Sequence, residues 1–311
     1  MTNSIFTLPA TYNESIKTYL PGSPERELLD QELARQMGLT LEIPLIINGR
    51  KIHTNDTEAA RCPHDHGHIL GTFSKASNKE ILLAIEAALS AKPAWEAMAW
   101  QDRAAIFLKA EDLISQKYIY LINAATMLNQ SKNAFQAEID ATCELVDFLR
   151  FNVRFMEEIY GNQPVSDKGI WNKTEYRPLE GFVFALTPFN FTAIAGNLCT
   201  APAMMGNTIV WKPASTAVLS GFYLMKIFKE AGLPDRVINF IPSKGSKTGK
   251  IVLDHKDFAV SILPVLPVCF RPCGRKPEKI LPAINPIPGL WERPGAKIIF
   301  LCTRRQIWML W

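Results

Sequence analysis

Two short segments carry side chains that could do chemistry, and each is joined to a continuous apolar run. Asn190 lies in the segment Thr-Pro-Phe-Asn-Phe that follows the run 182–186, and Lys212 ends the run 208–212 before Pro and Ala. An asparagine amide at the end of a strand can donate to an oxygen that becomes negative, without carrying charge itself. Either residue alone is more often a buried amide or a lysine whose ammonium reaches solvent, so the interpretation depends on the pair.

Two glycine patterns compete with this interpretation and are set aside. The dinucleotide fingerprint G-x-G-x-x-G is missing from the turn at 187–192, which disfavours an ordinary Rossmann site. Gly245 and Gly249 bracket only three residues, whereas the phosphate loop needs four between its glycines and a Ser or Thr after the lysine. Lys250 is followed by Ile251 instead.

A metal site is the next alternative, because Cys62, His64, His66 and His68 alternate as residues on one face of a strand would. A closed site requires a second ligand set with metal-like spacing, and the sequence contains none. We therefore expect no metal.

Cys143 and Cys199 fall within helical patterns. Buried thiols there serve packing more often than nucleophilic attack. We assign these two cysteines no chemistry.

The apolar runs and the helices between them predict how the site is positioned. Residues 181–242 read as strand, helix, strand, helix, strand, which predicts a parallel sheet with right-handed crossovers. Ligands of such sheets bind beyond the carboxyl ends of the strands, here near 187–190, 212–215 and 242–249. The fold class is therefore α/β, with an incomplete, Rossmann-like parallel sheet.

The preceding residues predict strands and helices that pack on this sheet. Strands are expected near 43–50 and 64–73, and Ser77 with Glu80 forms a capping box that opens a helix. The longest helical pattern covers 135–160, with Ile139 and Cys143 in its apolar stripe and the carboxylates of Glu138 and Asp140 directed elsewhere. Residues 161–180 break this period and suit an exposed hairpin arm.

Composition excludes several classes of protein. Of the 311 residues 48% are hydrophobic and 21% charged, as in an ordinary soluble protein. The net charge of +4 is concentrated in residues 261–311, which hold eight Lys or Arg and two acids, so the main body offers nucleic acid no basic surface. No export signal, transit peptide or membrane-spanning apolar run is seen, and the six cysteines show no disulfide spacing. We expect a cytoplasmic protein with no membrane or nucleic-acid partner.

The paired strand-end motifs resemble the aldehyde dehydrogenase superfamily. Residues 134–140 (A-F-Q-A-E-I-D), 147–152 (D-F-L-R-F-N) and 179–197 (L-E-G-F-V-F-A-L-T-P-F-N-F-T-A-I-A-G-N) are similar to its pyrroline-5-carboxylate branch, and the resemblance covers about residues 40–260. It implies oxidation of a small-molecule substrate, glutamate semialdehyde, to glutamate with NAD in proline degradation. It also implies a homo-oligomer, which this chain is not expected to complete.

The resemblance also implies roles for individual residues. Asn190 would hold the oxyanion of the thiohemiacetal, and Lys212 would hydrogen-bond the adenosine ribose of NAD. Glu138 and Phe189 would lie near the substrate, although a solvated helix carboxylate is an equally good interpretation of Glu138. The residues implied for cofactor binding are Thr187, Pro188, Phe189, Lys212, Ser215, Gly245 and Gly249.

The family pattern stops near residue 260. A T-G-S strand end, a segment bearing the catalytic Glu and the nucleophilic Cys are expected next, but residues 261–311 are rich in Pro, Cys and Trp without periodicity. One choice of codons for 261–270, regrouped in another frame, gives H-L-T-G-S-T-G-V-F, and the same regrouping of 288–297 gives R-I-V-G-E-T-G-G-K. We hypothesise a frameshift, to be tested by resequencing the gene.

This hypothesis sets the predicted domain organisation and activity. We expect amino-terminal strands and helices in 1–160, the hairpin arm in 161–180, a partial NAD-binding unit in 181–260 and a disordered out-of-frame tail in 261–311. Without the nucleophile and the general base, the chain is expected to have no dehydrogenase activity. The alternative function is an inactive product that binds NAD weakly or pairs with an intact subunit through the arm.

Overall fold

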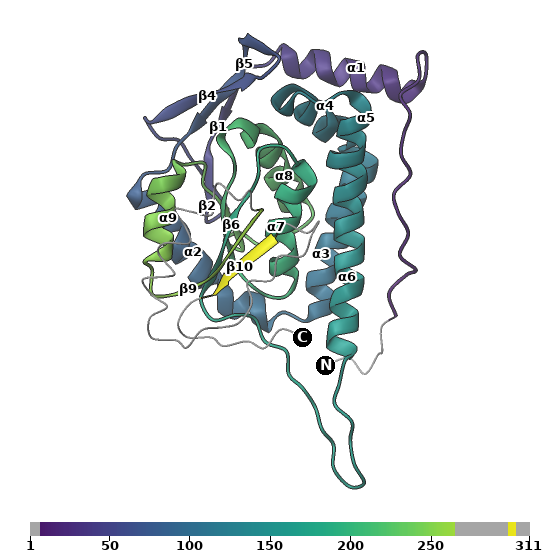
Figure 1. Ribbon diagram of the computed structural model, residues 1–311, viewed down its shortest axis with the longest axis vertical. Coiled ribbons are helices and arrows are strands. Elements are labelled where there is room, and N and C mark those ends of the chain that lie inside the picture. Colours follow the sequence, from purple (N-terminus) through teal and green to yellow (C-terminus); the bar gives the residue numbers. More distant parts are fainter. Residues whose placement is uncertain (1–6, 265–297, 303–311) are drawn as a thin grey trace.

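A seven-stranded sheet forms the centre of the computed structural model, which describes residues 7–264 and 298–302 (Figure 1). Its strand order is β10-β9-β6-β7-β8-β2-β3. The four inner strands β9, β6, β7 and β8 run parallel to one another. At one edge β10 pairs antiparallel with β9, and at the other edge β2 pairs antiparallel with β8 and β3 pairs antiparallel with β2. The strands are β2 (Leu45–Ile47), β3 (Arg50–Ile52), β6 (Phe182–Leu186), β7 (Ile209–Lys212), β8 (Ile238–Phe240), β9 (Phe258–Pro264) and β10 (Ile298–Cys302).

This arrangement confirms the predicted parallel unit. The chain runs β6, α7 (Thr192–Met204), β7, α8 (Val218–Glu230), β8, as the alternation of apolar runs and helical patterns indicated. A short 3-10 helix, η3 (Ser215–Ala217), precedes α8, and α9 (Gly245–Leu253) follows β8. The carboxyl ends of β6, β7 and β8 consequently meet at one edge of the sheet.

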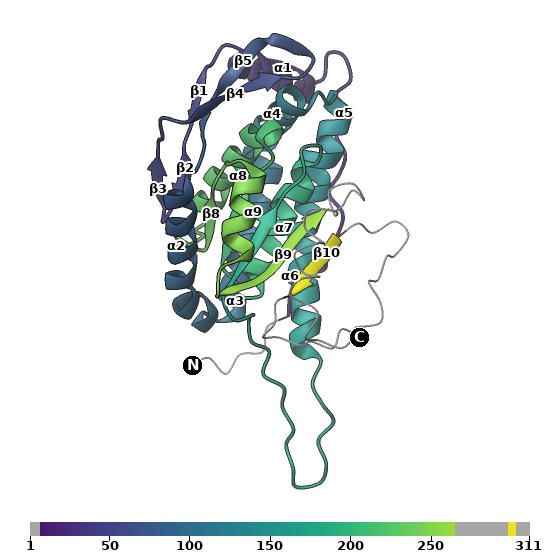
Figure 2. The same ribbon diagram turned by 60° about the vertical axis from the view of Figure 1, so that its left-hand side comes forward.

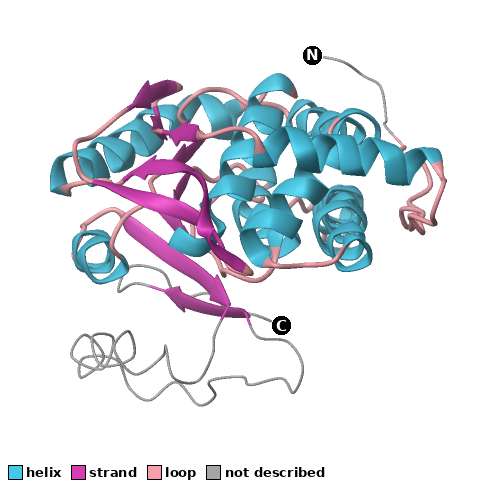
Figure 3. Ribbon diagram, turned by 90° about the horizontal axis from the view of Figure 1, so that it is seen from above, coloured by secondary structure: helices cyan, strands magenta, loops and turns pink. Residues whose placement is uncertain are grey.

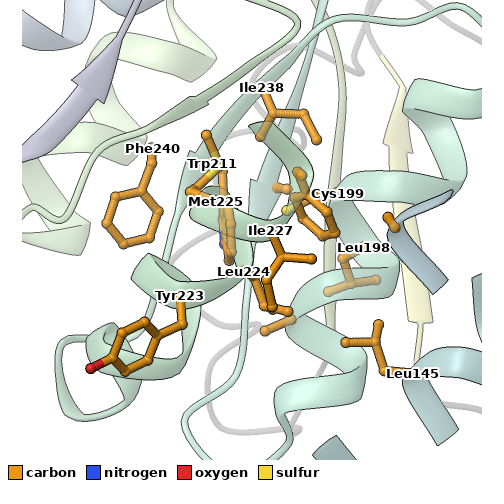
Figure 4. Packing of buried hydrophobic residues seen from close by; sticks show 14 of the residues in the cluster. Leu145, Leu198, Cys199, Trp211, Tyr223, Leu224, Met225, Ile227, Ile238 and Phe240 are labelled. Atoms are coloured by element: carbon orange, nitrogen blue, oxygen red, sulfur yellow. The ribbon is translucent and has the colours of Figure 1, made fainter. Parts of the chain in front are cut away.

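Alternate residues of the inner strands enter two different hydrophobic cores. Val183 and Ala185 of β6 pack with α6, α7 and α8, whereas Phe182 and Phe184 pack with α2 and α9 on the other face. Figure 3 shows helices on both sides of the sheet. Figure 4 shows the first core, where the rings of Trp211 and Phe240 pack edge to face with their centroids 5.1 Å apart.

The amino-terminal part adds a second, three-stranded sheet and a group of helices. The strands are β1 (Leu41–Ile43), β4 (Thr57–Cys62) and β5 (Asp65–Ser74), in the order β1-β5-β4. The helices are α1 (Pro24–Met37), α2 (Asn78–Ala97), α3 (Trp100–Asp112), η1 (Leu113–Lys117), α4 (Ile119–Gln130), α5 (Ala134–Ala137), η2 (Glu138–Glu144) and α6 (Leu145–Gly161). The predicted capping box of Ser77 and Glu80 opens α2.

The long helix predicted over 135–160 has the right extent but the wrong buried face at its start. Residues 138–144 form a π-helical turn between α5 and α6. The wider turn changes which side chains face inward, so Glu138 and Asp140 are 0% and 2% exposed while Ile139 is 38% exposed. The prediction that these two carboxylates project away from the core is therefore wrong.

Two irregular segments extend along or beyond this body. Residues 7–23, here called the strap, run beside α6 and the π turn (Figure 1). Residues 162–180 form a long excursion between α6 and β6 that contains no assigned strand (Figure 2). Its two limbs are joined where Gln163 accepts from the amide of Thr174 at 2.9 Å, and Trp171 near its tip is 96% exposed.

One strand of the sheet crosses the predicted tail boundary at residue 261. β9 continues to Pro264 beside β6, and residues 298–302 pair antiparallel with β9 as β10. The rest of the predicted tail lies outside the described residues, and the frameshift and the domain limits stay predictions. None of the helices in the described ranges is long and apolar enough to cross a membrane.

Candidate functional site

The two strand-end motifs lie at the same edge of the sheet. Leu186 and Lys212, the last residues of β6 and β7, are register partners, and Asn190 comes four residues after Leu186. The loop after β6 is also bound to β7, because the indole of Trp211 donates to the hydroxyl of Thr187 at 3.0 Å. The amide of Thr187 donates to the carbonyl of Lys212 at 3.2 Å.

A cavity of about 410 Å³ lies at this edge, beyond β7 and β8. Its lining comes from the ends of these strands, from the starts of η3 and α9, and from the small three-stranded sheet with the loop that follows it. The lining residues are Glu58, Lys75, Lys212, Ser215, Ser243, Lys244 and Gly245. The hydroxyl and ammonium groups among them suit a polar ligand with hydroxyl or anionic groups.

Lys212 is the unusual member of this lining. The residue is only 8% exposed, and within residues 7–264 no hydrogen bond or ion pair engages its ammonium group. Burial lowers the pKa of Lys212 below its ordinary value, and the charge of Glu58 opposes that shift in part. A buried ammonium with free donors is costly unless a ligand accepts from it.

The start of α9 supplies backbone donors to the same cavity. Its N-cap is Lys244, whose ammonium cannot accept from the first helical amides. A Cβ built on Gly245 would lie 3.9 Å from Lys212 Cε, so the glycine leaves open the space between the helix and the lysine. Gly249 lies one turn into α9 and is not among the lining residues.

Asn190 and Phe189 lie on the loop between β6 and α7 and are exposed, Phe189 to 56%. Among the described residues, none hydrogen-bonds the Asn190 side chain, so its amide is free to donate. The loop leads from Thr187, which contacts β7, into α7, and its residues are not among those that line the cavity. The roles expected for these residues toward a ligand stay predictions.

Glu138 is enclosed by protein. Its carboxylate accepts from the hydroxyl of Tyr19 at 2.6 Å, the side-chain amide of Asn123 at 2.7 Å and the backbone amide of Lys17 at 3.1 Å. The interpretation of Glu138 as a solvated helix carboxylate is therefore wrong. The carboxylate anchors the strap, and its expected place near the substrate stays a prediction.

The cysteines and histidines set aside earlier occupy other places. Cys62 is buried, and its thiol contacts His64 Nε2 at 3.1 Å, while no cluster with metal-ligand geometry occurs in the described part of the chain. Burial, reinforced by the charge of Glu138, raises the pKa of Cys143 to about 12, and burial alone raises the pKa of Cys199. High thiol pKa values oppose nucleophilic attack.

Sequence reasoning did not single out four of the lining residues. Two of them, Ser243 and Lys244, lie within the range 242–249 where the strand-end rule predicts ligand binding. Glu58 and Lys75 come from β4 and the loop after β5, and no local pattern signals that this small sheet reaches the cavity.

Comparison with known proteins identifies the family of the chain. The model of the aldehyde dehydrogenase family matches residues 52–263, and the chain belongs to that family. It is 48% identical over 260 residues to a mitochondrial delta-1-pyrroline-5-carboxylate dehydrogenase of Emericella nidulans, covering 83% of this chain and 45% of the relative. The human mitochondrial delta-1-pyrroline-5-carboxylate dehydrogenase is 44% identical over 240 residues, covering 77% of this chain and 43% of that protein.

Solved structures give the same result. The delta-pyrroline-5-carboxylate dehydrogenase of Mycobacterium tuberculosis bound with NAD and cobalamin superposes with a TM-score of 0.88 at 42% identity, over 90% of this chain and 53% of that one. The chain thus spans about half the length of the relatives it matches.

Proposed function

We propose that this chain provides the NAD-binding part of a dehydrogenase that oxidises glutamate semialdehyde, the open form of pyrroline-5-carboxylate, to glutamate in proline degradation. The observation that carries the proposal is that Lys212, a buried residue lining the cavity beside Gly245, has no partner for its ammonium among the described residues. The relatives named as pyrroline-5-carboxylate dehydrogenases, one of them solved with NAD, support it.

The lining residues fit a dinucleotide in chemical terms. Lys212 would donate to ribose hydroxyls, and the first amides of α9 beside Gly245 would donate to anionic oxygens. Ser215 adds a hydroxyl at the start of η3. When bound, NAD supplies the hydride acceptor, and Asn190 would direct its amide at the oxygen on which negative charge develops.

Complete turnover also needs a thiolate nucleophile and a general base. Cys62, Cys143 and Cys199 are all buried, so none of these three described thiols is accessible to a substrate, and we propose that the described part of the chain binds the cofactor without turning over. We keep the cytoplasm as the proposed location, although relatives in Emericella nidulans, Dictyostelium discoideum and human are among those named as mitochondrial proteins.

Titration of the purified chain with NADH, followed by nucleotide fluorescence, tests the cofactor proposal. Lys212→Met removes a charged donor and should weaken binding about tenfold or more. Lys168→Met, which removes an exposed lysine of the excursion, is the matched control and should leave affinity unchanged. Equal affinity of the Lys212→Met variant and the wild-type chain would contradict the proposal.

A second function, pairing with an intact subunit, is favoured by the excursion 162–180. Val165 and Trp171 are 89% and 96% exposed there, and apolar side chains this exposed are typical of a surface that a partner covers. Co-expression with a full-length homologue should yield a mixed complex that Trp171→Ser weakens. Recovery of the chain alone would count against this function.

A further inference from the structure

The first backbone amides of α7 donate their hydrogen bonds to a carboxylate on another helix. Its N-cap residue is Phe191, whose side chain has no oxygen to accept from the helix amides. Asp140, in the π turn η2, accepts from the amide of Thr192 at 3.0 Å and from the amide of Ala193 at 2.9 Å, one with each carboxylate oxygen. The carboxylate therefore performs the capping that the loop itself cannot provide.

A lysine holds this carboxylate in place and also contacts the loop. The ammonium of Lys132 lies 2.6 Å from Asp140, and the two side chains are only 15% and 3% exposed. The same ammonium stands over the ring of Phe191, 4.4 Å from its centroid. Lys132 thus joins Asp140 to the residue that follows Asn190.

The remaining side of the turn is fixed from α4. The hydroxyl of Thr192 contacts the hydroxyl of Thr126 at 2.8 Å and accepts from the side-chain amide of Gln130 at 2.7 Å. The backbone and the side chain of Thr192 are both constrained, two residues beyond Asn190. Ordered support of this kind is what a site needs when a donor must be aimed to within a fraction of an ångström.

We propose that Asp140 and Lys132 are positioning residues for Asn190. Because they fix Phe191, Thr192 and the first turn of α7, they set the direction of the loop that presents the Asn190 amide at the edge of the sheet. The functional value of this arrangement rests on the proposed dehydrogenase role of Asn190. The positioning itself can be tested without cofactor or substrate.

Asp147 offers a matched control on the adjoining helix. Its carboxylate also accepts two hydrogen bonds, from the side-chain amide of Asn13 at 2.6 Å and the backbone amide of Glu14 at 2.7 Å, but it holds the strap and not α7. Asp140→Asn and Asp147→Asn therefore make the same chemical change at two places, and only the first should affect Asn190.

The experiment uses the full chain labelled with ¹⁵N-asparagine, with the Asn190 signals assigned by their loss in Asn190→Gln. We expect Asp140→Asn and Lys132→Met to broaden or shift the NMR signals of Asn190. Asp140→Asn should also speed hydrogen exchange of the backbone amides of Thr192 and Ala193 about tenfold or more, because it weakens the hydrogen bonds that protect them. Asp147→Asn should leave these signals in place.

The outcomes separate positioning from ordinary stabilisation. If the melting temperatures of both Asp→Asn variants fall while the Asn190 signals stay unchanged, Asp140 is only a helix cap and the proposal is overturned. If Asp140→Asn does not fold, Lys132→Met alone decides, because it leaves the two backbone hydrogen bonds in place. Failure of the chain to bind NADH would overturn the proposed function and leave this measurement unaffected.

Discussion

Replacing Tyr19 by phenylalanine should cost a large share of the protein's stability. Tyr19 is only 4% exposed. Its hydroxyl donates to the carboxylate of Glu138 at 2.6 Å and accepts from the side-chain amide of Asn123 at 3.0 Å. A hydrogen bond to a buried carboxylate contributes about 1.5–3 kcal/mol, and Glu138 would keep its other donors. We therefore expect the free energy of unfolding to fall by about 2 kcal/mol.

Urea and thermal denaturation measure this loss. In a chain of this size, 2 kcal/mol corresponds to a melting temperature lower by roughly 3–4 °C. Tyr120→Phe is the control, because Tyr120 is partly buried and its hydroxyl has no hydrogen-bond partner among the described residues; its effect should stay within about 0.5 kcal/mol. Equal effects of the two substitutions would refute the reasoning.

The pH dependence gives an independent check. Burial, and then the carboxylate of Glu138, raise the pKa of Tyr19 well above its usual value. A group whose folded pKa is raised contributes stability that is complete below its unfolded pKa, here about 10, and is lost only above it. The deficit of Tyr19→Phe should therefore be constant between pH 7 and 9.

Four further substitutions have expected outcomes that denaturation measures. Gly181→Ala should lower the free energy of unfolding by about 3 kcal/mol or more, because φ is +86° and the new Cβ would lie 1.9 Å from the carbonyl oxygen of Asp257. Gly232 has a similar φ of +99°, but a Cβ there would meet nothing within 4 Å, so Gly232→Ala should cost only about 1–2 kcal/mol. Lys212→Met should raise the melting temperature at pH 7, because it removes a buried charge, and the gain should shrink as the pH approaches the unfolded lysine pKa of about 10.4. Arg103 is 4% exposed, and its guanidinium donates to the carbonyl of Met204 at 2.9 Å and to further backbone carbonyls. A lysine ammonium cannot reach all of these carbonyls together, so Arg103→Lys should lower the free energy of unfolding by about 2–4 kcal/mol.

Each of these has a contradicting result. Similar losses for the two glycine variants would mean that φ alone, and not the close approach to Asp257, sets the cost at Gly181. A stability gain in Lys212→Met that does not change with pH would show that packing, and not charge, is responsible. An Arg103→Lys variant as stable as the wild-type chain would show that its carbonyl partners are satisfied in another way.

The sequence was sufficient to predict the part of the site that comes from consecutive strands. Asn190 and Lys212 follow apolar runs separated by one helix, and a right-handed crossover places such ends at one edge. Successive side chains of a strand point to opposite faces of the sheet, which explains why the side chains of β6 divide between two cores. These features depend on local pattern and on a general rule of chain topology.

Other parts depend on contacts that no local pattern encodes. The burial of Glu138 and Asp140 follows from a π turn, a one-residue change of helical register that hydrophobic periodicity does not reveal. The wall of the cavity formed by Glu58 and Lys75 comes from a separate sheet. The strap is held by hydrogen bonds to acidic side chains and by the burial of Tyr19, and neither forms a helical or strand-like apolar pattern in the sequence.

The place of β2 in the sheet has a consequence for synthesis of the chain. Ile46 pairs with Phe240, and the amide of Asn48 donates to the side chain of Asn239, 191 residues further along. At about 5–20 residues per second, a ribosome needs roughly 10–40 s to deliver β8 after β2 has emerged. During that interval β2 can pair only with β3, and Leu45 and Ile47, both buried in the finished protein, lack the core on which they pack. The nascent chain should therefore occupy chaperones until translation has passed residue 240.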